Sequence, residues 1–179
     1  MDADNPCAIE ERYTRATTSS NLRCKADERS DVDILIACGL TPGILGGALM
    51  RLASEFDSSS EKRPGSKTDA ILLMGRLKSL PRVLEALEEW ALLRGLDAPG
   101  KLAQAAAAYY LDSKCTACEG RGHERIAGTP MLGRQCKVCR GTGKRKEPMG
   151  DAGRLMLNVM DDAVMVARNS IKRRLRNSA

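Results

Sequence analysis

Four cysteines in the last third of the chain have the spacing of metal ligands. They occur in two copies of one motif, C-x-x-C-x-G-x-G, which contain Cys115 and Cys118 and then Cys136 and Cys139. Seventeen residues separate the two pairs, within the interval of roughly 15–20 residues typical of four-cysteine zinc sites. Two cysteines three positions apart in a tight turn direct both sulfurs at one point, so two turns supply a tetrahedron of thiolates. The sequence therefore predicts one zinc ion bound by these four cysteines.

The glycines and the number of ligands define the kind of site. Glycines that follow each cysteine pair permit positive φ, so that backbone N–H groups can turn towards the thiolates and offset their charge. Four protein ligands leave no position for water, which predicts a structural rather than a catalytic zinc. We expect the metal to stabilise residues 115–148, here called the ribbon, because a segment of this size has too small a core of its own.

Other interpretations of these residues are weaker. An iron–sulfur cluster could use four cysteines, although the duplicated motif favours zinc. A redox C-x-x-C would be expected beside a βαβ pattern, which the sequence lacks. His123 is expected to be a surface or outer-shell residue, because a fifth donor is superfluous. Cys7 and Cys24 have no partner at a ligand spacing and are expected to be unligated, and Cys38 lies in an apolar run typical of the core.

The charge of the chain is concentrated near these cysteines. The 179 residues carry a net charge of +6. Residues 1–114 hold 15 Lys and Arg against 17 Asp and Glu, residues 115–148 hold 8 against 3, and residues 149–179 hold 6 against 3. A basic block on a neutral body suggests one anionic partner that is met by one face, most economically nucleic acid. The alternative is a basic surface that serves solubility alone.

The predicted DNA contacts are cations of the ribbon and of the segment after it. They are Arg121, Arg125, Arg134, Lys137, Arg140, Lys144, Arg145, Lys146 and Arg154. Lys137 and Arg140 are interleaved with the ligands of the second motif. A rigid ribbon with fixed cations can position phosphates and read base edges in double-stranded DNA. A charged ribbon that only contacts solvent is the alternative.

The composition predicts a mainly α protein around the ribbon. Hydrophobic residues make up 42% of the chain and aromatic residues only 3%, so the core must be aliphatic, which favours helices. Scarce aromatics also argue against a surface for single-stranded nucleic acid, which needs stacking side chains. We expect four parts: a flexible arm over 1–30, a helical body over 31–114, the zinc ribbon with short β-hairpins over 115–148, and a C-terminal helix over 149–179 that packs back on the body.

The first apolar segment of the body follows Asp31 and is broken near Gly39. Thr41 is expected to cap a second helix that begins at Pro42. The break resembles a degenerate helix-turn-helix, although a buried helical hairpin is favoured over a DNA-reading unit. The polar stretch 57–69 predicts a loop.

Helical periodicity continues over residues 69–95. Its apolar positions are Ile71, Leu72, Leu73, Leu77, Leu80, Val83, Leu84, Leu87, Trp90 and Leu93. Pro81 either kinks one helix or separates two, and Gly95 ends the pattern. A further helix is expected over roughly 98–112, where the alanines 105–108 allow a neighbouring helix to approach closely.

The last predicted helix, over residues 149–176, has a continuous apolar stripe. The stripe consists of Met156, Met160, Ala163, Val164, Ala167, Ile171 and Leu175, at spacings of three and four. The basic end of this helix complements the helix dipole, and contact with a phosphate or an acidic surface is the alternative.

No feature of the sequence indicates a membrane protein or an enzyme. No apolar run reaches the roughly 18–20 residues of a spanning helix, and the polar, acidic start does not resemble a secretory signal. We therefore expect a cytoplasmic protein, in which seven cysteines favour metal binding over disulfides. No nucleophile–base pair, phosphate loop or open metal site is recognisable, so no catalytic activity is expected.

The motifs resemble two known families. The C-x-x-C-x-G-x-G turns are similar to those of the cysteine-rich region of DnaJ-type chaperones. That region has four such repeats, whereas this chain has two, and the J domain of those chaperones is missing here. Most of residues 30–179 resembles the lambdoid phage late-gene antitermination proteins of the Q type. The resembling elements are the apolar segment ILIACGLTPGILGGALMRL, an Ala/Tyr-rich helix running into Cys115, both cysteine turns, and KRKEPMGDAGRLM entering the last helix.

The second resemblance implies a specific function. Such proteins bind DNA within a late promoter and engage paused bacterial RNA polymerase through the sigma factor and the β flap. They then make the polymerase read through pauses and terminators. In that family the zinc ribbon is inserted between two helices of a helix-turn-helix-like DNA-binding unit, which here implies helices ending at Ser113 and starting near Gly150. The alternatives are a zinc-dependent DNA-binding regulator without polymerase engagement and a DnaJ-like zinc module that binds unfolded peptides.

Overall fold

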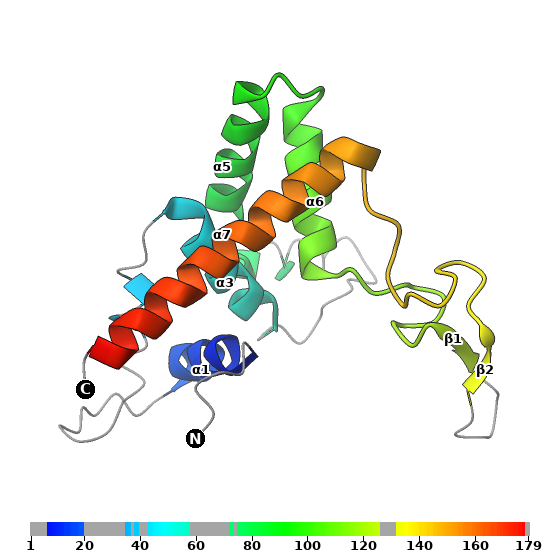
Figure 1. Cartoon of the computed structure of the whole chain (residues 1–179), viewed down its shortest axis with the longest axis horizontal. Coiled ribbons are helices and arrows are strands. Elements are labelled where there is room, and N and C mark those ends of the chain that lie inside the picture. Colours follow the sequence, from blue (N-terminus) through cyan, green and yellow to red (C-terminus); the bar gives the residue numbers. More distant parts are fainter. Residues whose placement is uncertain are drawn as a thin grey trace.

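The protein is mainly helical, as the composition predicts. The computed structural model describes residues 7–19, 35–36, 38–39, 43–57, 72–73, 75–125 and 132–177. Its helices are α1 (Cys7–Thr18), α3 (Ile44–Asp57), α5 (Leu80–Leu93), α6 (Pro99–Leu111) and α7 (Gly150–Asn177), and its strands are β1 (His123–Arg125) and β2 (Leu132–Gln135) (Figure 1). The strands form an antiparallel hairpin between α6 and α7. In this part of the chain no helix is both long and apolar enough to cross a bilayer.

The helical body is organised around α7. This 28-residue helix packs against α3 and α6, while α5 packs against α6 and α3 (Figure 1). The predicted apolar stripe is confirmed, because six of its seven residues are buried and Ala163 is partly buried. The six buried residues are Met156, Met160, Val164, Ala167, Ile171 and Leu175. The alanines of α6 also behave as predicted, since Ala106 and Ala107 are buried in the same core.

The N-terminal segment contains a helix where a flexible arm is predicted. Within α1, Tyr13 and Ala16 are buried in the core, and the Thr17 Oγ1 atom lies 3.3 Å from Ser54 Oγ on α3. The prediction for residues 1–30 is therefore wrong over 7–18. A contact made by so few apolar side chains leaves no hydrophobic periodicity for sequence reasoning to detect. Residues 1–6 and 20–30 lie outside the described part of the chain.

Pro81 separates two helical segments rather than kinking one. Residues 77–79 form a turn, and α5 begins at Leu80 with proline in its first turn. The Glu55 carboxylate of α3 accepts hydrogen bonds from the backbone N–H of Ser79 (2.9 Å) and from its hydroxyl (2.8 Å). A carboxylate at a helix N-terminus satisfies exposed N–H groups and complements the dipole. Glu55 thus fixes the start of α5 against α3.

The apolar positions of this region divide between core and surface. Leu77, Leu80, Val83 and Leu87 are buried and Leu73, Leu84 and Trp90 are partly buried, but Leu72 and Leu93 are 57% and 82% exposed. Leu93 is the last residue of α5 and lies beyond the point where the helix packs on its neighbours. Ile71 lies outside the described residues.

Glycines determine the ends of two elements and one helix crossing. Gly95 has a φ of 64° and follows α5 as predicted, and Gly43 has a φ of 84° immediately before α3. α3 begins at Ile44, two residues after the predicted start at Pro42, and Thr41 and Pro42 are outside the described residues. At Gly46, α3 lies so close to α7 that a Cβ atom would collide with the carbonyl oxygen of Ala163.

This crossing predicts opposite effects for two neighbouring glycine substitutions. Alanine normally stabilises a helix by about 0.5–1 kcal/mol relative to glycine. A Cβ atom added at Gly47 would meet no atom within 4 Å, so Gly47→Ala should raise the free energy of unfolding by about that amount. Gly46→Ala should lower it by about 1–3 kcal/mol, because the backbone of α7 must move. Urea denaturation of both variants measures the difference, and equal shifts would contradict this crossing.

Candidate metal centre and nucleic-acid surface

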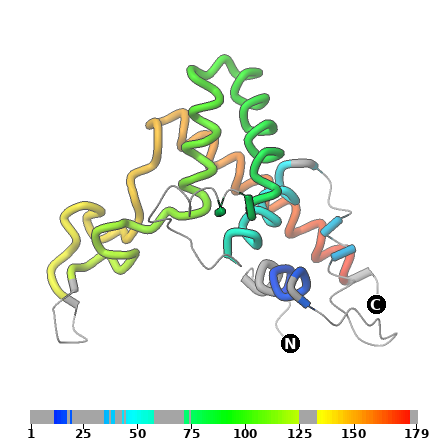
Figure 2. The backbone as a smooth tube through the Cα atoms, turned by 180° about the vertical axis from the view of Figure 1, so that it is seen from behind, coloured from blue at the N-terminus to red at the C-terminus, as the bar shows by residue number. Residues whose placement is uncertain are grey.

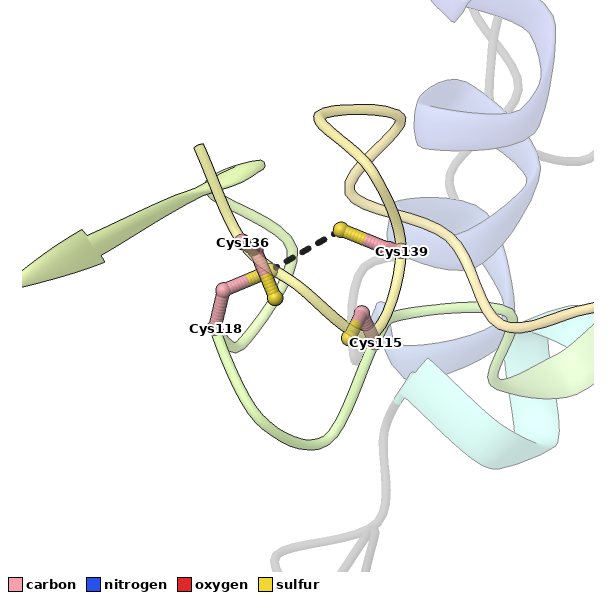
Figure 3. Close-up of side chains that lie close together, drawn as sticks. All are labelled: Cys115, Cys118, Cys136 and Cys139. Carbon is pink, nitrogen blue, oxygen red and sulfur yellow. Dashed lines mark hydrogen bonds between the residues drawn. The ribbon is translucent and has the colours of Figure 1, made fainter. Parts of the chain in front are cut away.

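The structure gathers the four predicted cysteines into one buried cluster. Cys115, Cys118, Cys136 and Cys139 are at most 8% exposed, and all four sulfurs lie within 4.8 Å of one another (Figure 3). The Cys118 and Cys139 sulfurs are 3.6 Å apart. Tetrahedral Zn–S bonds of about 2.3 Å place the sulfurs about 3.8 Å apart. The cluster therefore fits one structural metal ion such as zinc.

Each cysteine pair lies in a turn that directs N–H groups at sulfur. We call residues 115–122 the first knuckle and residues 136–143 the second knuckle. The backbone N–H of Gly122 donates to Cys118 Sγ, and that of Gly143 donates to Cys139 Sγ, both at 3.3 Å. These bonds are the predicted N–H···S contacts, and they stabilise negative charge on sulfur.

The two knuckles are joined by a reciprocal pair of backbone hydrogen bonds. The N–H of Cys115 donates to the Gly143 carbonyl, and the N–H of Cys136 donates to the Gly122 carbonyl, both at 2.8 Å. The first cysteine of each knuckle is thus bonded to the last glycine of the other. The arrangement is approximately two-fold symmetric, and it brings the cysteines together through the backbone as well as through a metal.

The glycines at the ends of the knuckles are required by close backbone contact. Gly122 and Gly143 have φ values of 77° and 70°. A Cβ atom on Gly122 would collide with the carbonyl oxygen of Gly141, and one on Gly143 would collide with that of Gly120. The motif therefore needs glycine both for its left-handed backbone and for the space at this position.

The cysteine thiols do not titrate alike. Burial raises the pKa of the Cys118 thiol to about 11, although the hydrogen bond from the Gly122 N–H acts to lower it. Burial also raises the pKa of Cys139, but the Gly143 N–H and hydrogen bonds from neighbouring cysteines outweigh it and lower this pKa overall. The two pKa values thus shift in opposite directions although the sulfurs are only 3.6 Å apart. A metal ion needs both groups as thiolates, so its binding is coupled to proton release.

The ribbon is attached to the end of α6 through Arg145. The backbone N–H of Arg145 donates to the Ser113 carbonyl at 2.8 Å, and the Arg145 guanidinium donates to the carbonyls of Ala108 and Asp112. The Tyr109 hydroxyl donates to the Arg145 carbonyl at 3.2 Å. Arg145 is one of the predicted DNA contacts, but in the structure its guanidinium caps the C-terminus of α6, where a cation also complements the dipole.

The other predicted DNA contacts divide into two groups. Arg121 forms an ion pair with Glu119 at 3.1 Å, and Arg154 pairs with Asp151 within the first turn of α7. Five remaining cations have exposed side chains: Arg134, Lys137, Arg140, Lys144 and Lys146. The side chain of Arg125 lies outside the described part of the structure. Arg121 and Arg154 are exposed as well but paired, so among the described side chains the cations without an ion-pair or capping role are fewer than the sequence count suggests.

The two basic segments of the last third do not form one surface. α7 is 28 residues long, which corresponds to about 42 Å. Its first residue lies on the side of the ribbon, and its basic C-terminal end lies beside α1 on the opposite side of the body (Figures 1 and 2). The expectation of a single basic face is therefore wrong, and the ribbon and the helix end are separate sites of positive charge.

Two residues near the cluster show what spacing alone predicts and what it misses. The His123 ring nitrogen Nδ1 lies 3.4 Å from the Arg121 carbonyl oxygen, and the histidine is not a member of the sulfur cluster. Gln135 is not among the predicted site residues, yet its side-chain amide donates to the Arg140 carbonyl at 3.0 Å. Gln135 directly precedes Cys136, as Lys114 precedes Cys115. Extending the repeat by one residue would therefore have included Gln135 among the candidate site residues.

The comparisons with known proteins assign no family. No family model matches the chain, and no curated protein or solved structure matches it either. The resemblance to the lambdoid phage family stays a prediction, and the four-cysteine cluster is what defines the site.

Loss of one sulfur is expected to abolish metal binding. Cys136→Ser leaves three cysteine ligands and removes one thiolate charge from the four-sulfur site, so the bound metal should fall from about one ion per chain to near zero. Elemental analysis of the purified protein measures this ratio. Cys38→Ser is the matched control, because Cys38 lies outside the cluster, and it should retain the metal. Equal metal content in the two variants would exclude the proposed ligands.

A glycine variant tests the knuckle backbone without touching a ligand. Gly122→Ala should weaken metal affinity by about 10–100-fold, because its Cβ atom would collide with the Gly141 carbonyl oxygen and displace the N–H that donates to Cys118. Gly150 also has positive φ, at 60°, but a Cβ atom there would meet nothing within 4 Å. Gly150→Ala should therefore cost some stability and leave metal affinity unchanged. Competition with a chromophoric chelator measures both, and a similar loss in both would attribute the effect to φ alone.

Proposed function

We propose that the chain is a DNA-binding regulator of transcription whose ribbon is stabilised by one zinc ion. The observation that carries this proposal is a closed cluster of four buried sulfurs within a segment of high positive charge. Four thiolates suit zinc in a structural role. Sulfurs within 4.8 Å of one another favour a single ion over a cluster of several irons with bridging sulfides.

The surface of the ribbon supports nucleic acid over unfolded peptide as the partner. Peptide binding requires an apolar groove, and Val138 is the one large hydrophobic side chain exposed among residues 114–124 and 133–148, whose side chains the structure describes. The exposed cations, in contrast, surround the second cysteine pair. A metal-fixed ribbon that carries them can hold phosphates at defined positions. This balance favours double-stranded DNA, since aromatic stacking groups for single strands are scarce.

The antitermination step rests on the resemblance to the lambdoid phage Q-type proteins. In this proposal the ribbon docks on promoter DNA, and the helical body engages bacterial RNA polymerase and its sigma factor. The exposed face of α5 offers acidic and apolar groups for such a contact, with Glu85 and Glu89 followed by Leu92 and Leu93. A protein held at the RNA exit would prevent terminator hairpins from forming. The second candidate is a DNA-binding regulator that does not engage polymerase.

Read-through by purified polymerase distinguishes these candidates. The template carries the late promoter from the genome that encodes the chain, upstream of an intrinsic terminator. Wild-type protein should increase the read-through fraction several-fold, Cys136→Ser should have no effect, and Cys38→Ser should act like wild type. Promoter binding without any change in read-through would support the second candidate. Absence of DNA binding at low salt would contradict both.

A further inference from the structure

The two knuckles have the same backbone but different surfaces. A shift of 21 residues places each position of the first knuckle on one of the second. Glu119 and Arg140 correspond, with φ values of 52° and 50°, and so do Gly120 and Gly141, with 87° and 84°. The N–H···S bonds correspond as well. Each surface residue of one knuckle therefore has an equivalent in the other, and the two surfaces can be compared position by position.

The first knuckle has no net positive charge to offer. Thr116 and Ala117 lie between its cysteines, and the next residue after the pair is Glu119. The Glu119 carboxylate pairs with the Arg121 guanidinium at 3.1 Å. A phosphate that approached this knuckle would meet a carboxylate and a cation already paired with it, which is unfavourable for binding.

The second knuckle presents cations at the equivalent positions. Lys137 replaces Thr116 and Arg140 replaces Glu119, and both side chains are exposed. Thr142 stands where the first knuckle has its arginine, and its hydroxyl donates to the Cys139 carbonyl at 2.8 Å. Val138, which is 70% exposed, lies between the two cations in the sequence.

The backbone that carries these side chains is held in place. The Arg140 N–H donates to the Cys136 carbonyl at 2.8 Å, and its carbonyl accepts from the Gln135 side chain at 3.0 Å. A residue fixed on both sides of its Cα atom loses little backbone entropy when its side chain binds a ligand, which favours a preorganised contact.

We propose that, of the two knuckles, only the second contacts DNA. Lys137 and Arg140 bind phosphates on one strand of a duplex, and Val138 makes an apolar contact in the groove beside that strand. The first knuckle serves the metal and makes no DNA contact. This inference rests on the proposed DNA-binding function and assigns it to three residues.

Exchange of equivalent residues tests the assignment. Lys137→Thr with Arg140→Glu gives the second knuckle the residues of the first at these two positions. Lys101→Thr with Arg82→Glu is the matched control, because it changes the charge equally at exposed positions on α6 and α5. Fluorescence anisotropy with a short mixed-sequence DNA duplex, over a series of salt concentrations, measures affinity and its salt dependence. Elemental analysis confirms that each variant keeps its metal.

The knuckle variant should bind at least tenfold more weakly. The negative slope of log K against log salt, with K the association constant, should become shallower by about 1.8, or about 0.9 for each phosphate that is no longer bound. The control should change affinity by less than about threefold with the same slope. Val138→Ala should weaken binding at every salt concentration without changing the slope. These three results together would support the proposal.

A combined variant separates position from charge. Adding Thr116→Lys and Glu119→Arg to the knuckle variant restores the net charge but moves the cations to the first knuckle, and binding should stay weak. Recovery of binding, an equal loss in knuckle variant and control, or tighter binding of a same-length RNA duplex would overturn the inference while leaving a nucleic-acid function intact. No binding of DNA by the wild-type protein at low salt would overturn the proposed function itself.

Discussion

The structure of the ribbon depends on the stabilisation of negative sulfur in a buried place. Four thiolates repel one another and lose water when they gather, so the cluster needs compensating positive charge. The backbone supplies part of it through the N–H groups of Gly122 and Gly143, and a metal ion would supply the rest. In the proposed function the charged surface depends on this balance, because the same turns carry the sulfurs and the exposed cations.

The helical body provides a rigid base for the ribbon. α7 packs against α3 and α6, and the Glu55 carboxylate joins α3 to the start of α5. Arg145 then connects the end of the ribbon to the end of α6. The two ends of the ribbon therefore lie side by side at the end of α6, where Lys114 and Lys144 form a β-bridge, and movement of the ribbon relative to α6 requires these bonds to break.

The sequence predicts what depends on local spacing. The cysteine intervals predict the sulfur cluster, the following glycines predict the N–H···S bonds, and the apolar stripe of the last helix predicts which face of α7 is buried. Each pattern follows from the geometry of a turn or a helix. The position of Pro81 at the start of α5 is likewise a local effect of its missing N–H.

Interactions between distant segments could not be predicted in this way. The guanidinium of Arg145 reaches carbonyls more than 30 residues earlier, and no spacing distinguishes it from the exposed Lys144 and Lys146 beside it. α1 enters the core with Tyr13 and Ala16, too small a contact to produce a visible period. The length of α7, rather than its composition, separates the basic helix end from the ribbon. In each of these cases the tertiary arrangement decides the role of the residue.

The reciprocal bonds between the knuckles also bear on how the chain is made. Cys115 reaches its partner only when Gly143 is present, and Gly122 reaches its own only when Cys136 is present. During synthesis on the ribosome the first cysteine pair emerges well before the second. It offers an ion two sulfurs at most until the later segment follows, so the full set of four ligands becomes available only shortly before the residues of α7 appear.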